Sequence, residues 1–291
     1  MKKIWMILAA GLLMLAACAP TPPATTDGPS VDDIVAATMQ ALTAAAPPPT
    51  STQPADGMAI SFQHVRFVIP DGLATNALAG TVPAVNETEG PMMANAPEHV
   101  KFEFDNYALS NIFHDAQILI FPMQEYAAMN EGAAGDIAKL QAIINGTAAA
   151  DADNLPHISI FNAAQVFAAQ IQTVKFANGS GVRYITEYAQ YVATVNNADM
   201  FYCFQGLTND GKYYILAILP ISHPLLAYDA NPETVIPEGG IPFPGYDNTD
   251  ASAFDAYYDS VIALLNQQAA NSFMPTLVSL DKLIESITIA P

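Results

Sequence analysis

Basic residues are scarce in this chain of 291 residues. Nine lysines and arginines stand against 28 aspartates and glutamates, which gives a formal net charge of −19 at pH 7. A surface this acidic repels the phosphate backbone of nucleic acids and the headgroups of anionic lipids. Nucleic-acid binding is therefore excluded, and attachment to a membrane would need something other than a basic patch.

Cysteine is also scarce, with Cys18 near the N-terminus and Cys203 in the apolar run 200–204. If Cys18 is modified, as argued below, Cys203 has no partner for an intramolecular disulfide. A thiol inside an apolar, strand-like run is typical of a buried and inert core residue. The fold must then rest on its apolar core, and 52% hydrophobic residues suffice for one full domain.

The N-terminal apolar run is too short to span a bilayer. Lys2 and Lys3 precede an uncharged run from Ile4 to Ala17. This build is typical of an export signal and differs from a transmembrane helix in length. The sequence therefore predicts a signal peptide and an extracytoplasmic protein.

The end of this run, Leu15-Ala16-Ala17-Cys18, resembles a bacterial lipobox. In that family of precursors the cysteine receives a diacylglyceryl thioether, and a dedicated peptidase cuts just before it. The resemblance implies a signal peptide over 1–17 and a mature protein that begins at lipidated Cys18. Two or more acyl chains, palmitate being typical, would anchor it to the cell membrane or the outer membrane. The alternative is ordinary secretion, with cleavage at the small residues around Cys18.

Residues 18–57 are rich in proline, threonine and alanine, with Pro47-Pro48-Pro49 near the end. Such a composition buries too little apolar surface to fold alone, which predicts a disordered stalk. Ser30 is a good N-cap for a short helix over 31–45. Whether that helix docks on the domain is left open.

From Met58 the pattern changes, and residues 58–291 are expected to form a single globular α+β domain. Asn178-Gly179 and Asn209-Asp210-Gly211 are hairpin signals, so they predict a central four-strand antiparallel meander. About seven strands are expected in an antiparallel sheet with helices packed on its faces. The expected strands are 60–70, 100–104, 117–121, 165–176, 182–192, 200–207 and 212–219. The expected helices are 135–145, 251–270 and 277–287, and the long loops are 71–99 and 220–249.

Four segments of this domain resemble a family of uncharacterised bacterial lipoproteins with Pro/Thr-rich stalks. They are Gly181–Tyr184, Phe204–Tyr214, Leu219-Pro220 and Leu280–Ile287. That resemblance implies a lipoprotein but no activity. The order of strands followed by terminal helices is also similar to the PsbP/Mog1-like sandwich, which concerns architecture alone, because a fold does not carry a function.

Motifs for catalysis are missing from the sequence. It has no Gly-x-Ser-x-Gly elbow, no His-Glu-x-x-His and no Cys-x-x-Cys, so neither a serine hydrolase nor a zinc enzyme has sequence support. His114 and Asp115 are adjacent, but neighbours on a strand face opposite ways and make no dyad. No catalytic residue is predicted. The five histidines are scattered over positions 64, 99, 114, 157 and 223.

The acidic stretch 229–259 suggests Ca²⁺ as a possible ligand, because hard cations prefer oxygen ligands. The candidate ligands are Asp247, Asp250, Asp255 and Asp259. Their spacing matches no EF-hand loop. A solvated acidic loop without any metal is the alternative.

Tyrosines concentrate in the predicted meander. Tyr184, Tyr188, Tyr202 and Tyr214 are the candidates for a ligand site that stacks a sugar ring or a peptide. Core packing is the alternative, because tyrosine is a good strand former. The whole pattern favours a membrane-anchored, surface-exposed, non-enzymatic binding or interaction module of the cell envelope, with an envelope protein, peptide or glycan as its ligand. An envelope hydrolase with a site assembled from scattered histidines and carboxylates is the alternative.

Overall fold

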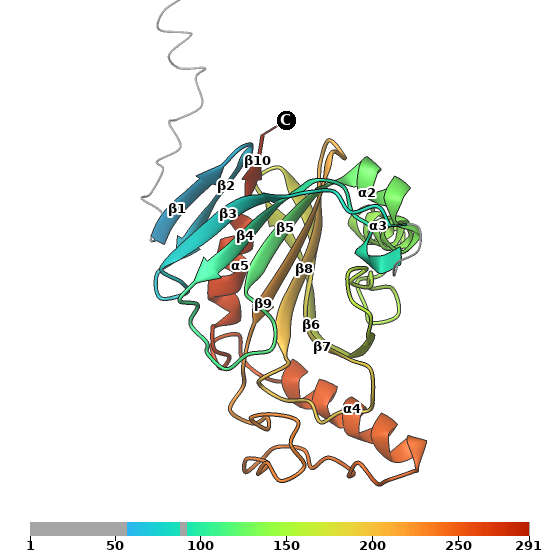
Figure 1. The fold of residues 1–291 in the computed structure, drawn as a ribbon. Coiled ribbons are helices and arrows are strands. Elements are labelled where there is room, and N and C mark those ends of the chain that lie inside the picture. Colours follow the sequence, from blue (N-terminus) through green and yellow to red (C-terminus); the bar gives the residue numbers. More distant parts are fainter. Residues whose placement is uncertain (1–56, 88–91, 291) are drawn as a thin grey trace, which may run out of the picture. The chain divides into compact units, whose positions relative to one another are not determined.

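A seven-stranded antiparallel sheet organises the part of the chain that the computed structural model describes, residues 57–87 and 92–290 (Figure 1). The predicted signal peptide, Cys18, most of the stalk and the helix 31–45 lie outside these residues. The strand order is β3-β4-β5-β9-β8-β7-β6. The strands are β3 Asn76–Val82, β4 His99–Asp105, β5 Gln117–Pro122, β6 Ala164–Phe176, β7 Gly179–Ala189, β8 Phe201–Thr208 and β9 Tyr213–Pro220.

The predicted α+β class and the four-strand meander are confirmed. Strands β6 to β9 follow one another in sequence and in the sheet, and each pairs antiparallel with the next. A short turn at Asn178 connects β6 to β7, and the turn Asn209–Lys212 connects β8 to β9, as their sequences predict. All eight residues of β8 are buried, because the sheet is covered on both faces at this strand.

The N-terminal part of the domain differs from the prediction. The expected single strand 60–70 is a hairpin of β1 Gly57–Phe62 and β2 Val65–Pro70. Its turn places Gln63 at φ +50°, a left-handed conformation that the sequence did not signal. With β10, Thr288–Ile289, this hairpin forms a separate three-stranded sheet.

The prediction of an irregular loop over 71–99 is also wrong, because this segment contains strand β3 and the 3₁₀ helix η1, Met92–Ala94. The remaining long loop, from Ile221 to Asp250, does not meet the connection from β3 to β4. That connection follows Val82, which pairs with His99, while Phe201 pairs with Pro220 at the opposite end of the sheet. The two loop regions therefore lie at opposite ends of the strands.

Four α-helices lie within the described residues: α2 Met123–Met129, α3 Glu131–Ile144, α4 Ala251–Asn266 and α5 Leu277–Glu285. Helix α3 covers one face of the sheet against β7 and β8, and α5 packs on the other side against β2 and β6 (Figure 1). Alternating residues along the strands supply two cores, with Tyr184 and Cys203 under α3 and Ile185 and Phe204 on the side of α5. The domain thus has helices on both faces of its sheet, as predicted.

Helix α4 lies at the lower end of the sheet in Figure 1, where it contacts β6. The same end holds the C-terminus of β7 and the N-termini of β5, β6 and β8, as the pairs Gln117↔Ile218 and Ala164↔Ala189 show. Several connections between strands therefore meet there. No helix among the described residues has the length and apolar character needed to cross a membrane.

Candidate functional site

A pocket of about 540 Å³ opens at this end of the sheet, where β7 ends and β8 begins. We call it the sheet-end pocket and define it by residues 113–114, 161–163, 187–191, 193 and 199. These residues come from the β4–β5 connection, the segment before β6, the end of β7 and the segment before β8. The volume lies in the range of small-molecule sites, and strand ends hold much of the lining in place.

Aromatic rings enclose His114 in this pocket. Its ring stacks on Phe161 with centroids 5.1 Å apart and meets Phe201 edge-on at 4.7 Å. Burial lowers the pKa of His114 to about 4, although the charges of Asp199 and Asp115 act in the opposite direction. Among the described residues the buried Nε2 atom of His114 has no hydrogen-bond partner. The imidazole is therefore neutral at physiological pH.

Two acidic residues, Glu187 and Asp199, are among those that line the pocket. Glu187 is only 1% exposed, and its Oε2 accepts a hydrogen bond from the Asn196 backbone N–H at 3.2 Å. The Asn196 side chain donates to Asp199 Oδ2 at 2.8 Å and so links the two acids. Burial raises the pKa of Glu187 well above its ordinary value, and the charge of Asp199 adds to the shift. The described residues that line this pocket include no lysine or arginine.

Large aromatic side chains stand exposed at the pocket mouth. Phe113 is 75% exposed and Tyr191 is 66% exposed. A neighbouring hollow of about 720 Å³ shares residues 161–163 and 189–191 with the pocket and extends to Tyr258 of α4. Exposed apolar groups concentrated around a hollow are a usual mark of a binding site.

Helix α4 fixes the segment that follows β7. Tyr258 donates its hydroxyl proton to the Ala193 carbonyl at 3.0 Å, and the Tyr257 hydroxyl accepts from the Val195 N–H at 3.0 Å. These bonds attach the backbone at residues 193 and 195, which follows Tyr191, to helix α4. The rim of the pocket is thus built on hydrogen-bonded backbone, which favours a preformed site.

Of the four tyrosines predicted to bind a ligand, the structure brings only Tyr188 into the pocket. Tyr184 and Tyr214 lie under α3, where Gln205 donates to the Tyr184 hydroxyl at 2.8 Å and accepts from Tyr214 at 2.7 Å. Tyr202 faces the opposite side of the sheet. None of these three side chains is among the residues that line the pocket.

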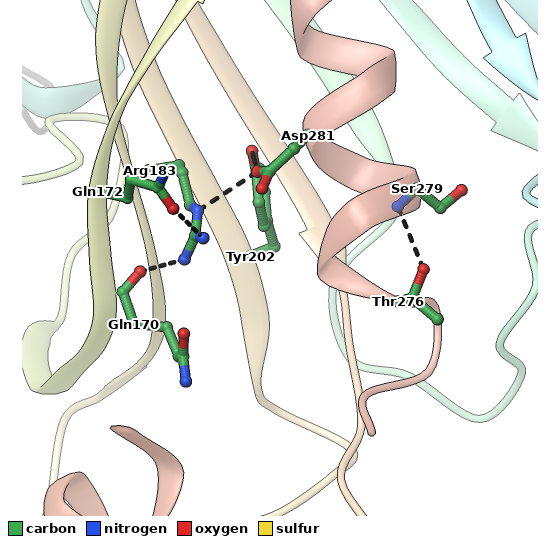
Figure 2. Close-up of polar contacts among 7 residues, drawn as sticks. All are labelled: Gln170, Gln172, Arg183, Tyr202, Thr276, Ser279 and Asp281. Atoms are coloured by element: carbon green, nitrogen blue, oxygen red, sulfur yellow. Dashed lines mark hydrogen bonds and ion pairs between the residues drawn. The ribbon is translucent and has the colours of Figure 1, made fainter. Parts of the chain in front are cut away.

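Tyr202 belongs to an internal ion-pair cluster (Figure 2). Its hydroxyl donates to Asp281 Oδ1 at 2.9 Å, and Arg183 Nε lies 3.3 Å from the same oxygen. The Arg183 guanidinium also donates to Gln172 Oε1 at 2.6 Å and to the Gln170 carbonyl. This cluster ties β6, β7 and β8 to helix α5, so Tyr202 has a structural partner there.

The four candidate calcium ligands do not gather at one point. Asp250 caps α4, because its carboxylate accepts from the Ser252 hydroxyl at 2.7 Å and from the Ser252 N–H at 2.9 Å, and these hydrogen bonds lower its pKa. Asp247, Asp255 and Asp259 are exposed. Across residues 57–87 and 92–290, no three histidine, cysteine, aspartate or glutamate side chains are arranged to hold a metal ion. Calcium binding stays a prediction from composition, and Asp250 has a role as a helix cap.

A second polar cluster lies beside a hollow of about 560 Å³ next to α3. Ser159 donates its hydroxyl proton to Asp136, which also accepts from the His157 backbone N–H at 2.8 Å. The His157 ring contacts the Ala163 carbonyl through Nε2 at 3.0 Å. The serine is thus bonded to the carboxylate and not to the imidazole, unlike a Ser-His-Asp triad.

Sequence reasoning missed Glu187, His114 and Asp199 as site residues. Glu187 offered one signal, because an acidic residue inside the strand-like run 182–192 must be either exposed or specially placed. His114 and Asp199 carried no such signal. More than 70 residues of sequence separate them from each other, so only the fold brings them together.

Comparisons with known proteins identify no relative of this chain. No family model matches it. No curated protein and no solved structure matches it either. The two family resemblances seen in the sequence stay predictions, and the function rests on the site alone.

Proposed function

We propose that this protein is a lipid-anchored binding module of the bacterial envelope, whose ligand occupies the sheet-end pocket. The pocket itself carries the proposal. It combines aromatic walls, a neutral histidine and two acidic residues on a scaffold of strand ends. An apolar cavity with a few converging polar groups is the usual form of a small-molecule site.

Among the described residues that line the pocket there is no serine, threonine or cysteine. This lining gives no support to hydrolysis through a hydroxyl or thiol nucleophile beside a general base. Aromatic side chains at the rim instead supply contact area at a low cost in conformational entropy. The observations thus support retention of a ligand near the membrane.

The lipid anchor completes the proposal. Lys2, Lys3, the apolar run and Cys18 support export and lipidation, and the composition of 18–57 supports a spacer. A spacer would hold the pocket away from the lipid surface. The protein would then present its site to soluble or wall-bound ligands outside the cytoplasm.

Native mass spectrometry tests the proposed site on the full-length chain purified from cells in non-ionic detergent. Ala163 lines both hollows, so Ala163→Trp should fill the pocket and abolish a bound small molecule that the unaltered chain retains. Ala79→Trp, on the exposed surface of β3, is the matched control and should retain it. A bound molecule that survives Ala163→Trp would place the ligand elsewhere.

A hydrolase is the second candidate, and the two carboxyl groups favour it. A raised pKa suits Glu187 to act as a general acid, and Asp199 would activate water as the base, as in glycoside hydrolysis. Glu187→Gln should then abolish turnover of glycoside substrates while ligands still bind. Absence of turnover by the unaltered chain, together with retained binding, supports the binding module.

A further inference from the structure

We infer that the ligand of the sheet-end pocket is an organic cation, a substituted ammonium group with apolar or hydroxylated arms. The inference rests on the proposed function, because it names the class of ligand for the same pocket. Three features of the described residues carry it: the charge of the lining, the arrangement of the aromatic rings and the burial of Glu187.

The charge of the lining has one sign. Glu187 and Asp199 contribute carboxyl groups, and no lysine or arginine is among the residues that line the pocket. Arg183 lies four residues before Glu187 on β7, but it is paired with Asp281. A cation that enters the pocket would gain the attraction of both acids, whereas an anion would meet their repulsion and that of a strongly acidic protein.

The aromatic rings give the cation a second kind of contact. Phe113, Phe161, Tyr188 and Tyr191 all line the pocket. An ammonium group over an aromatic face is attracted by the ring quadrupole, and the attraction grows when water is excluded. His114 is neutral, so it adds no competing positive charge to the pocket.

Burial of Glu187 explains why the cation must come from a ligand. The one hydrogen bond that its carboxyl group makes to the described residues comes from the Asn196 amide. A buried acid with so little support stays protonated until a positive charge arrives. Binding should therefore release a proton and should strengthen as the pH rises. Other titratable groups near Glu187 are Asp199, His114, Tyr257 and Tyr258.

A bare metal ion fits the pocket less well than an organic cation. Ca²⁺ takes six to eight oxygen ligands, and no three acidic, histidine or cysteine groups converge within the described part of the chain. Two carboxyl groups and four rings match a single, diffuse positive charge with apolar substituents. The hollow of about 720 Å³ beside the pocket leaves room for those substituents.

Isothermal titration calorimetry on the full-length chain in non-ionic detergent tests the inference. The probes are choline and its neutral isostere 3,3-dimethyl-1-butanol, which differ only in the charge of the central atom. Choline should bind at least about tenfold more tightly, because each tenfold step needs only about 1.4 kcal/mol of charge interaction. Equal affinities of the two compounds would overturn the inference.

Variants identify the groups responsible. Glu187→Gln keeps the shape of the side chain and should weaken choline binding about tenfold or more, and Asp199→Asn should weaken it in the same direction. Glu285→Gln on the exposed surface of α5 removes the same charge outside the pocket and should change nothing. Choline binding that is unaffected by both pocket variants would contradict the assignment.

A matched pair of variants tests the aromatic contact at the rim of the pocket. Tyr191→Ala should weaken choline binding about two- to thirtyfold, the range expected for a lost cation–π contact. Tyr228→Ala removes another exposed tyrosine, 56% exposed and outside the pocket lining, and should leave affinity unchanged. Equal effects of the two substitutions would count against an aromatic contact.

Failure of the inference and failure of the proposed function give different results. If the neutral alcohol binds as well as choline and Ala163→Trp abolishes both, the pocket is a binding site but not for cations. If binding of either probe survives Ala163→Trp, the site itself is wrong.

Discussion

Two ionisable side chains on the same strand differ in how many polar partners surround them. Arg183 and Glu187 are both buried on β7. Arg183 has a carboxylate, a carbonyl and an amide oxygen as partners, whereas Glu187 has one backbone N–H. Because an unsupported buried acid lowers stability, its presence at a pocket favours a functional role. We therefore assign Arg183 to the stability of the fold and Glu187 to the proposed binding site.

The ion pair of Arg183 should make a large contribution to stability. Asp281→Ala removes the partner of Arg183 and the acceptor of the Tyr202 hydroxyl, and we expect it to lower the free energy of unfolding by about 3 kcal/mol. Glu103→Ala breaks the exposed pair with Lys101 and should cost less than about 1 kcal/mol. Denaturant titration measures both. Similar losses would show that the buried cluster has no special weight.

Glu187 should make the stability of the fold depend on pH. Its pKa is raised above 4.5, so above that pH the folded state keeps a proton that the unfolded chain has released. Stability contributed by this group is therefore present below about pH 4.5 and falls as the pH rises, by at most about 1.4 kcal/mol per pH unit. Glu187→Gln should remove this fall.

Other groups change the stability of the fold in the same pH range. The effect of Glu187 must therefore be measured as the difference in stability between the unaltered chain and Glu187→Gln. Asp136 has a raised pKa and shifts stability in the same direction, while the lowered pKa of His114 acts in the opposite one. Both are present in the variant. The stability of Glu187→Gln relative to the unaltered chain, from thermal unfolding, should grow between pH 4.5 and pH 8. A constant difference would mean that Glu187 is ionised and supported in the fold.

Among the elements, strands β7 and β8 pair at a point where two glycines face each other. Gly181 pairs with Gly206, and a Cβ atom on Gly181 would lie 2.1 Å from the Gln205 carbonyl oxygen. Backbone cannot give way cheaply there, so Gly181→Ala should destabilise the fold by about 3 kcal/mol. Gly80→Ala on β3 meets nothing within 4 Å and should change stability by less than about 0.5 kcal/mol. Equal effects in urea titrations would refute this packing.

Elements with local turn signals could be predicted from sequence, and those without could not. Asn178 and Asn209-Asp210-Gly211 are typical of hairpin turns, and the meander that they predict is confirmed. The turn between β1 and β2 is made by Gln63 and His64, which carry no such chemistry, so the hairpin was missed. Strand β3 reads Asn-Ala-Leu-Ala-Gly-Thr-Val, and its weak β-propensity hid it.

The site was beyond sequence reasoning because it depends on how strand ends meet. Tyrosine density led to Tyr184 and Tyr214, but alternation along the strands places both under α3. His114 comes from the β4–β5 connection, Glu187 from the end of β7 and Asp199 from the segment before β8, and only the fold brings His114 to the other two.

For the molecule as a whole, the strong acidity and the predicted lipobox must be explained together. A protein with this net charge is repelled by anionic lipid, so its attachment to a membrane would rest on the covalent anchor. Cys18→Ser should leave an unlipidated precursor and move the protein out of the membrane fraction once any other cleavage occurs. Fractionation and mass spectrometry of the mature N-terminus measure this. An unmodified N-terminus downstream of Cys18 in the unaltered protein would refute lipidation.

Amide hydrogen exchange of the full-length chain with and without choline locates the ligand. We expect added protection in residues 113–114, 161–163 and 187–199, because these segments form or support the sheet-end pocket. The hollow beside α3 at Met93 and Gly132 should not change. Protection confined to the pocket segments is the predicted result. Protection elsewhere, or no protection at choline concentrations that saturate binding, would contradict a ligand site at the end of the sheet.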